Sequence, residues 1–178
     1  GTNAHIIDPN TNRVVDIIEG FPIAHAAVNL PDVTYFYFAN EFVNQIDVVD
    51  TTTLEVVDRI PLIDRPNKLV INETYRKLYV GIRDAAYLQV IDVDTHEIIK
   101  TLPVHFGIHN VYVTKDDEYV VAGLAKNPDT VDEPTIQVID ASTDEIAFGV
   151  PLDGHRVRPM AIESNSDGSP KRIFAQGT

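Results

Sequence analysis

The stretch QVIDVDTHEII, residues 89–99, decides the fold, because nearly the same phrase returns as QVIDASTDEIA at 137–147. Two looser copies lie upstream, HIIDPNTNRVV at 5–15 and DVVDTTTLEVV at 47–57. An Asp anchors each copy, at positions 8, 50, 92 and 140, and the anchors are spaced by 42, 42 and 48 residues. A period of 20 to 50 residues is the sequence signature of a repeat architecture.

Each copy predicts a strand, a tight turn and a second strand. A short apolar run precedes every anchor Asp, a Thr follows at the third place, and an apolar pair comes after the Thr. The Asp carboxylate accepts backbone N–H groups inside such a turn, and the Thr hydroxyl supports it. As a catalytic or metal signature DVDTHE is weak, because the other three copies lack its His. The phrase therefore recurs because each copy closes one hairpin.

Two more strands fit into each period. The earlier set reads Ala26-Ala27-Val28, Leu69-Val70-Ile71, Val111-Tyr112-Val113 and Met160-Ala161-Ile162. The later set reads Tyr35-Phe36-Tyr37-Phe38, Lys77-Leu78-Tyr79-Val80, Tyr119-Val120-Val121 and Arg172-Ile173-Phe174. No segment has a convincing helical period. The fold class is therefore all-β, and a four-stranded antiparallel unit of this length predicts a β-propeller blade.

The repeats divide one β-propeller domain, 1–178, into five parts. They run over about 1–22 (a half blade), 23–66, 67–109, 110–159 and 160–178 (a half blade). The longer third period contains an insert at 126–134, which we expect to be a surface loop between the second and third strands.

The repeat resembles that of the YVTN-type (YVTN/YNCE repeat) β-propeller family over essentially the whole chain. The family pattern runs roughly YVTN, then V-x-V-I-D-x-x-T, then a Gly–Pro connector. The matching residues here are Tyr37-Phe38-Ala39-Asn40, Tyr79-Val80-Gly81, Ile91-Asp92-Val93-Asp94-Thr95, Gly20-Phe21-Pro22, Arg65-Pro66 and Arg158-Pro159. The resemblance indicates the fold specifically but says little about function, because members of the family include enzymes and surface proteins.

About four repeats leave the ring incomplete, and three arrangements stay open. Similar proteins more often form seven-bladed rings, so the resemblance favours a truncated or partial larger propeller. Alternatively, the N-terminal strands complete the last blade and close a four-bladed ring. In the third arrangement two chains pair through their open blade edges as a homodimer, since bare strand edges invite pairing.

Composition excludes several partners. The net charge of −13 makes nucleic acid and anionic membranes poor partners, because phosphate binding relies on clustered Lys and Arg. No apolar run approaches the ~20 residues that cross a bilayer. The chain has no Cys, which rules out disulfides and thiolate chemistry but does not fix the compartment. The location stays open, with a secreted or periplasmic location favoured over a cytoplasmic one.

The resemblance implies where a site would lie. In such propellers a connector runs from the outermost strand of one blade to the innermost strand of the next, at the mouth of the central channel. The four connectors, 20–25, 62–68, 105–110 and 153–158, hold four of the six His and several cations. The catalytic candidates are His109, His155, Arg156 and Arg158, and the ligand-binding candidates are His25, Arg65, Asn67, Lys68, His105 and Asn110.

These residue types suit a small anionic or carbohydrate ligand. An Arg guanidinium binds a carboxylate through two parallel hydrogen bonds, and a His of pKa ~6.5 can accept and donate protons at neutral pH. The alternative is a purely structural role, in which the His and Arg side chains of the connectors form hydrogen bonds with backbone carbonyls or ion pairs with the nearby Asp64 and Asp153. Converging His could also hold Zn²⁺, but no helical HxxxH pattern supports this, and we predict neither a metal site nor a cofactor.

The sequence therefore predicts a binding or scaffold propeller with a His- and Arg-lined channel mouth. The first alternative is a carbohydrate-active enzyme, either a uronate-type polysaccharide lyase or a lactonase. In the lyase, Arg156 or Arg158 would neutralise the uronate, and His109 or His155 would abstract the neighbouring proton. The second alternative is a truncated or engineered structural fragment without activity.

Overall fold

The computed structural model describes residues 3–20, 24–125, 133–153 and 156–177, and its regular elements there are all β-strands. Three four-stranded antiparallel sheets lie between two two-stranded ones. In chain order the strands are β1 (Asn3–Asp8), β2 (Arg13–Glu19), β3 (Ala24–Asn29), β4 (Tyr35–Asn40), β5 (Gln45–Asp50), β6 (Val56–Pro61), β7 (Pro66–Asn72), β8 (Lys77–Ile82), β9 (Tyr87–Asp92), β10 (Ile98–Pro103), β11 (Ile108–Val113), β12 (Tyr119–Leu124), β13 (Ile136–Asp140), β14 (Glu145–Val150), β15 (Val157–Ser164) and β16 (Pro170–Gly177). No helix in these residues is long and apolar enough to cross a membrane.

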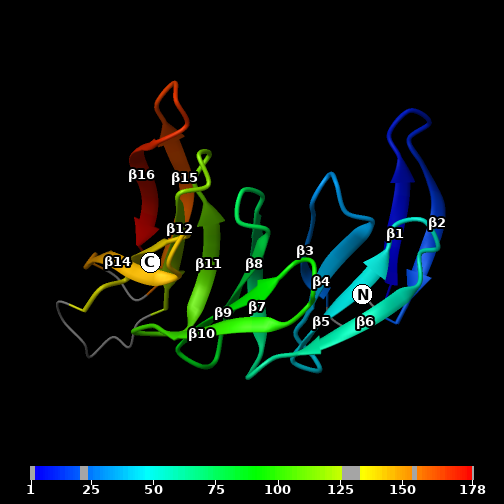
Figure 1. The fold of residues 1–178 in the computed structure, drawn as a ribbon, viewed down its shortest axis with the longest axis horizontal. Coiled ribbons are helices and arrows are strands. Elements are labelled where there is room, and N and C mark those ends of the chain that lie inside the picture. The colour runs from blue at the N-terminus through cyan, green and yellow to red at the C-terminus, as the bar shows by residue number, and fades with distance from the viewer. Residues whose placement is uncertain (1–2, 21–23, 126–132, 154–155, 178) are drawn as a thin grey trace.

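The sheets stand side by side around an arc (Figure 1). Their first strands face one another along the inside, where β7 contacts both β3 and β11, and β11 contacts β15. The last strands, β6, β10 and β14, lie on the outer rim. This is the arrangement of propeller blades, and the predicted all-β propeller fold is confirmed.

The four anchor aspartates build the predicted turns. The amides of Thr52 and Thr53 donate hydrogen bonds of 2.7 and 2.9 Å to Oδ1 of Asp50. Asp8, Asp92 and Asp140 accept equivalent bonds from the backbone two residues further on. These bonds hold the pKa of the Asp50 carboxyl below its ordinary value, because they favour the charged form.

Each of these turns ends in a left-handed residue four places after its Asp. The residues are Asn12, Leu54, His96 and Asp144, with φ between 54° and 61°. Each of them donates its backbone N–H to the carbonyl of its anchor Asp, at 2.8 to 3.0 Å. That bond fixes the hairpin despite the steric cost of a positive φ for a residue with a Cβ.

The core lies between neighbouring blades. One apolar cluster joins the facing sides of the first and second complete blades and includes Tyr37, Val48 and Ile91. A second cluster joins the second and third blades and includes Tyr79, Val90 and Ile139. Because both faces of the middle sheets are buried, strands such as β8 and β9 carry apolar residues on both sides.

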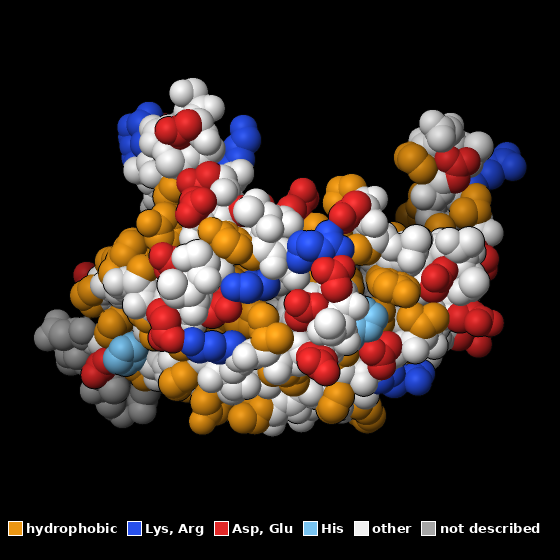
Figure 2. Space-filling view, viewed as in Figure 1, with side chains coloured by type: hydrophobic (Ala, Val, Ile, Leu, Met, Phe, Trp, Pro, Cys, Tyr) orange, Lys and Arg blue, Asp and Glu red, His pale blue; other side chains and the backbone are white. Residues whose placement is uncertain are grey.

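The two half blades do not close the ring. β1 pairs with β2 and β15 with β16, and no pairing links β16 to β1 in the part of the chain that the structure describes. The two pairs lie at opposite ends of the arc (Figure 1) and form separate projections (Figure 2). The four-bladed ring closed by the N-terminal strands is therefore not the observed arrangement, because the arc of blades is too open to bring its ends together.

Three of the inner strands begin earlier than the predicted repeat boundaries. β7 begins at Pro66, β11 at Ile108 and β15 at Val157, one, two and three residues before the predicted starts. Pro66 suits the first position of a strand, where the N–H that Pro lacks is not needed for the ladder. Most of the insert at 126–134 lies outside the described residues.

Candidate functional site

In the three complete blades, the second residue of the inner strand lies in a β-bulge. The pairing of β3 with β4 skips His25, that of β7 with β8 skips Asn67, and that of β11 with β12 skips His109. These positions are 42 residues apart, so they are the same place in successive blades. A bulge leaves one residue out of the ladder and re-aims its side chain.

Side chains at this position connect one blade to the next. Nδ1 of His25 lies 2.7 Å from the carbonyl oxygen of Asn67, and Nδ2 of Asn67 donates to the carbonyl oxygen of His109 at 3.0 Å. The buried Asn67 amide also lies 3.4 Å from the carbonyl oxygen of Ile108. The bulged positions are thereby held in a row across three blades.

A buried carboxylate lies beside this row. Glu41 follows β4 directly and is 9% exposed. Its Oε1 has no hydrogen-bond partner, although Nδ1 of His25 lies 3.9 Å away and Nη1 of Arg83 lies 3.6 Å away. A carboxylate removed from water normally accepts hydrogen bonds, so an unsatisfied oxygen here indicates capacity for another donor.

Arg83 follows β8 at the position that Glu41 has after β4. Its Nε lies 3.9 Å from Oδ1 of Asp84, and Nη1 of Arg65 donates to Oδ2 of the same carboxylate at 3.1 Å. Two arginines from a connector and a loop thus share one half-exposed Asp.

A cavity of about 160 Å³ opens at this end of the inner strands. It is lined by Arg83, Asp84, Ile108, His109, Ala125 and Arg156. We call these six residues, together with His25, Glu41, Arg65 and Asn67, the mouth. The mouth combines guanidinium groups, imidazoles and two carboxylates at one end of the inner strands, and the six residues of the cavity form its concave part.

The hydrogen bonds fix different tautomers for the two histidines. A carbonyl oxygen only accepts, so Nδ1 of His25 carries the proton and Nε2 keeps its lone pair in the neutral ring. Nδ2 of Asn110 lies 3.0 Å from Nδ1 of His109 and donates to it, which leaves the proton of neutral His109 on Nε2. One ring is therefore suited to accept a proton and the other to donate one.

The structure brings together some of the predicted site residues. His25, Arg65, Asn67, His109 and Arg156 belong to the mouth. Asn110 contacts the ring of His109, and Lys68, half-buried, follows Asn67 in β7. His155 and the side chain of Arg158 lie outside the described residues.

His105 is not brought to the mouth. Its backbone N–H donates to Oε1 of Gln137 on β13, two strands out from the channel, and its Nδ1 lies 2.9 Å from Oε2 of Glu133. Ile63 bonds Gln89 in the same way one blade earlier, so this contact belongs to the repeated path of the connector. His105 thus lies apart from the inner-strand residues, and its role as a ligand-binding residue stays a prediction.

Sequence reasoning missed Glu41, Arg83 and Asp84, because it considered only the connectors before the inner strands. The loops after the second strands reach the same end of the blades, since neighbouring strands run antiparallel. A signal was present: positions 41, 83 and 125 are equivalent in the repeat but hold Glu, Arg and Ala. Such variation within a regular repeat marks positions that the fold itself does not dictate.

The mouth does not assemble a metal centre among the described residues. No group of three or more His, Asp or Glu side chains in those ranges lies close enough to hold a metal ion. The carboxylates of the mouth are instead engaged by arginines.

A family model of the YNCE-like beta-propeller matches residues 5–119, which is more than half of the chain. The chain belongs to the YNCE-like β-propeller family. The match spans the first two complete blades and reaches the third, so it includes His25, Glu41, Arg83 and His109 of the mouth. No curated protein matches the sequence.

The blades of this YNCE-like propeller are also similar to a solved structure. Hydrazine synthase of Kuenenia stuttgartiensis superposes with a TM-score of 0.80 at 19% identity, over 94% of this chain and 48% of that one. The chain thus spans about half the length of that protein. At this level of identity the likeness shows the fold alone.

Proposed function

We propose that this YNCE-like propeller is a binding protein whose mouth holds a small anionic or carbohydrate ligand. The observation that carries the proposal is the cavity of about 160 Å³ between Arg83, Arg156 and His109. Guanidinium groups recognise a carboxylate through paired, charge-assisted hydrogen bonds. Concave sites with a few convergent polar groups are where proteins usually bind small ligands.

The carboxylates of the mouth favour a ligand that also has hydroxyl groups. Oε1 of Glu41 has room for a donor, and Asp84 lies half-exposed between two arginines. A sugar acid offers both a carboxylate for the arginines and hydroxyl donors for the acids. A uronate is therefore the ligand class that uses most of the mouth.

The test is calorimetric titration of the protein with D-glucuronate, with D-glucose as the neutral counterpart. We expect binding of glucuronate to weaken about tenfold or more in Arg83→Gln and Arg156→Gln, because a charge-assisted hydrogen bond contributes roughly 1.5–3 kcal/mol. Arg76→Gln is the matched control, since Arg76 also pairs with two carboxylates, Asp32 and Asp94, but lies at the opposite end of β8. Equal affinity for both sugars, or equal loss in the control, contradicts the proposal.

A lyase acting on polyuronates is the second candidate, and the contrast between the two His tautomers favours it. In such an elimination Nε2 of His25 takes the proton next to the carboxylate, the C–O bond to the leaving sugar breaks, and Nε2–H of His109 protonates the departing oxygen. The base is then His25 and not His109 or His155. Polygalacturonate incubated with the protein should gain the ultraviolet absorbance of an unsaturated product, and His25→Gln should abolish the gain while the fold is kept. If the wild-type chain produces no increase in this absorbance, the lyase is excluded and only the binding proposal remains.

A further inference from the structure

The carboxylate of Asp84 belongs to the loop after β8 but takes no part in shaping it. The anchor aspartates of the hairpins accept N–H groups of their own turns, as Asp50 does from Thr52. No backbone N–H among the described residues donates to Asp84, whose side-chain partners there are Arg65 and Arg83. The equivalent position one blade earlier holds a phenylalanine, at 42, so the repeat does not require an acid here.

The two oxygens of Asp84 face two different arginines. Nη1 of Arg65 donates to Oδ2 at 3.1 Å, and Nε of Arg83 lies 3.9 Å from Oδ1. The backbone holds these arginines together, because the N–H of Arg83 donates to the carbonyl oxygen of Arg65 at 2.8 Å. A carboxylate that presents both oxygens to guanidinium groups is the arrangement expected of a bound acid. Asp84 therefore occupies the place that the carboxylate of a ligand would take.

Arg83 lies between two acids without a close bond to either. Its Nη1 is 3.6 Å from Oε1 of Glu41, and no hydrogen bond of its guanidinium group occurs among the described residues. The side chain of Glu41 is 9% exposed, whereas that of Asp84 is 50% exposed. The buried acid keeps Arg83 in place, and the exposed acid is the one that a ligand can displace. This exchange is easy, because exposed ion pairs contribute little in water.

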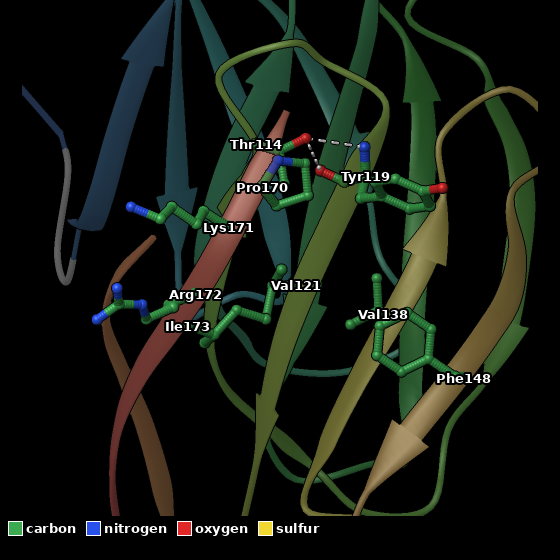
Figure 3. Close-up of a pocket in the computed structure, with 9 residues that line it drawn as sticks. All are labelled: Thr114, Tyr119, Val121, Val138, Phe148, Pro170, Lys171, Arg172 and Ile173. Atoms are coloured by element: carbon green, nitrogen blue, oxygen red, sulfur yellow. Dashed lines mark hydrogen bonds between the residues drawn. The ribbon is translucent and has the colours of Figure 1, made fainter. Parts of the chain in front are cut away.

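The larger cavity, of about 320 Å³ beside β16, is less suited to an anion. Figure 3 shows that the charged ends of Lys171 and Arg172 point away from its apolar lining. The smaller cavity at the mouth lies between Arg83 and Arg156, and Asp84 is part of its wall. A ligand with a carboxylate thus has its guanidinium partners at the mouth, where it must compete with Asp84.

We propose that Asp84 is an internal counter-ion that makes the mouth selective for acids that also have hydroxyl groups. This inference rests on the proposed binding of a sugar acid at the mouth. A simple carboxylate such as acetate must displace Asp84 from Arg65 and Arg83 and offers it no hydrogen bond in return. A sugar acid displaces Asp84 in the same way, but one of its hydroxyl groups then donates to the freed carboxylate. Asp84 thereby lowers the affinity for the simple acid more than the affinity for the sugar acid.

NMR of the arginine Nε–H groups tests the proposal at the residues concerned. Sodium acetate and sodium D-glucuronate are titrated separately, at constant ionic strength, into the wild type, Asp84→Ala and Asp84→Asn. The dissociation constants come from the shift of the Arg83 resonance, which Arg83→Gln identifies by its loss. We expect acetate to bind about fivefold more tightly to both Asp84 variants, because an exposed ion pair no longer competes.

Glucuronate should distinguish the two Asp84 variants. Its binding should tighten about as much as that of acetate in Asp84→Asn, since the amide oxygen still accepts a hydroxyl group. In Asp84→Ala the acceptor is lost together with the charge, so the affinity for glucuronate should stay within about twofold of the wild-type value. The preference for glucuronate over acetate is therefore expected to fall in Asp84→Ala.

Asp32→Ala is the matched control, because Asp32 is also an exposed partner of an arginine, Arg76, at the opposite end of β8. It should leave both dissociation constants unchanged. The proposal is overturned if acetate binds no more tightly to the Asp84 variants than to the wild type. Equal tightening of both ligands in Asp84→Ala also overturns it. Glucuronate that leaves the wild-type Arg83 resonance unmoved contradicts the proposed function instead, whereas the acetate comparison reports on Asp84 alone.

Discussion

The hydroxyl of Tyr79 donates a 2.6 Å hydrogen bond to Oδ1 of Asp144, which joins the second strand of one blade to the hairpin turn of the next. Nζ of Lys77 reaches Oδ2 of the same carboxylate at 2.8 Å. Burial, and then the bond to Asp144, raise the pKa of Tyr79 far above its ordinary value. One blade earlier the hydroxyl of Tyr37 donates to the carbonyl oxygen of Val93 at 3.0 Å, and burial raises its pKa to about 12.

We expect Tyr79→Phe to lower the free energy of unfolding by roughly 1–3 kcal/mol, because it removes a donor from a nearly buried carboxylate. Denaturant titration followed by circular dichroism measures this loss. Tyr112→Phe is the control: Tyr112 is half-buried on the inner strand β11, and no hydrogen bond of its hydroxyl occurs among the described residues. Equal losses in the two variants would contradict a role for the bond between blades.

The anchor aspartates make stability depend on acidity. The pKa of Asp50 in the folded chain lies below its ordinary value of 3.8, because the amides of Thr53 and Thr52 bond the charged form. A lowered folded pKa contributes stability that is fully present above pH 3.8 and is lost as the pH falls through the folded value.

Asp50→Asn should therefore flatten the fall of stability at low pH while the turn is kept, because an amide oxygen still accepts the same N–H bonds. The measurement is the free energy of unfolding of both proteins from neutral pH to below 3.8. If the two curves stay parallel through that range, the charged turn does not contribute as argued.

The sequence predicted those parts of the fold that local chemistry decides. The spacing of Asp and Thr indicated the four hairpins. In each of them the Asp carboxylate accepts a hydrogen bond from the backbone N–H two residues later, and this bond forms the same turn in every repeat. Tyr37 and Tyr79, at equivalent places in the repeat, both pack between blades. The order of the blades along the chain was predicted from the period of the sequence repeat alone.

The site and the ends of the arc could not be predicted in the same way. Whether β16 reaches β1 depends on the angle between neighbouring blades, and the sequence of a single repeat does not determine that angle. His105 and His109 are four residues apart, yet one lies over β13 and the other on β11. Glu41 and His25 meet across a strand pair, and only the three-dimensional path of β3 and β4 sets their distance.

The amide of Asn67 connects two inner strands, and its loss should affect both the fold and the mouth. Asn67→Ala removes the donor to the His109 carbonyl and is expected to cost about 1–3 kcal/mol of unfolding free energy. Asn67→Asp should cost at least as much at neutral pH, because a carboxylate cannot donate this bond. Asn29→Ala, at an exposed place on the inner strand β3, is the control and should change little. Thermal unfolding of the four proteins decides between a structural and a neutral role.

Gly107 sets the distance between a connector and the loop that carries Arg83. A Cβ at this position would lie 1.9 Å from the carbonyl oxygen of Arg83, far inside contact distance. Gly107→Ala must therefore displace backbone at the mouth, and we expect a loss of about 1–3 kcal/mol in unfolding free energy together with weaker glucuronate binding. Gly149→Ala is the matched control, because its Cβ would lie 2.7 Å from Pro134, away from the mouth. It should lose stability but keep the wild-type affinity for glucuronate, measured by the same calorimetry. If Gly107→Ala also keeps that affinity, the ligand does not depend on the position of Arg83, and the anion site must be sought elsewhere on the propeller.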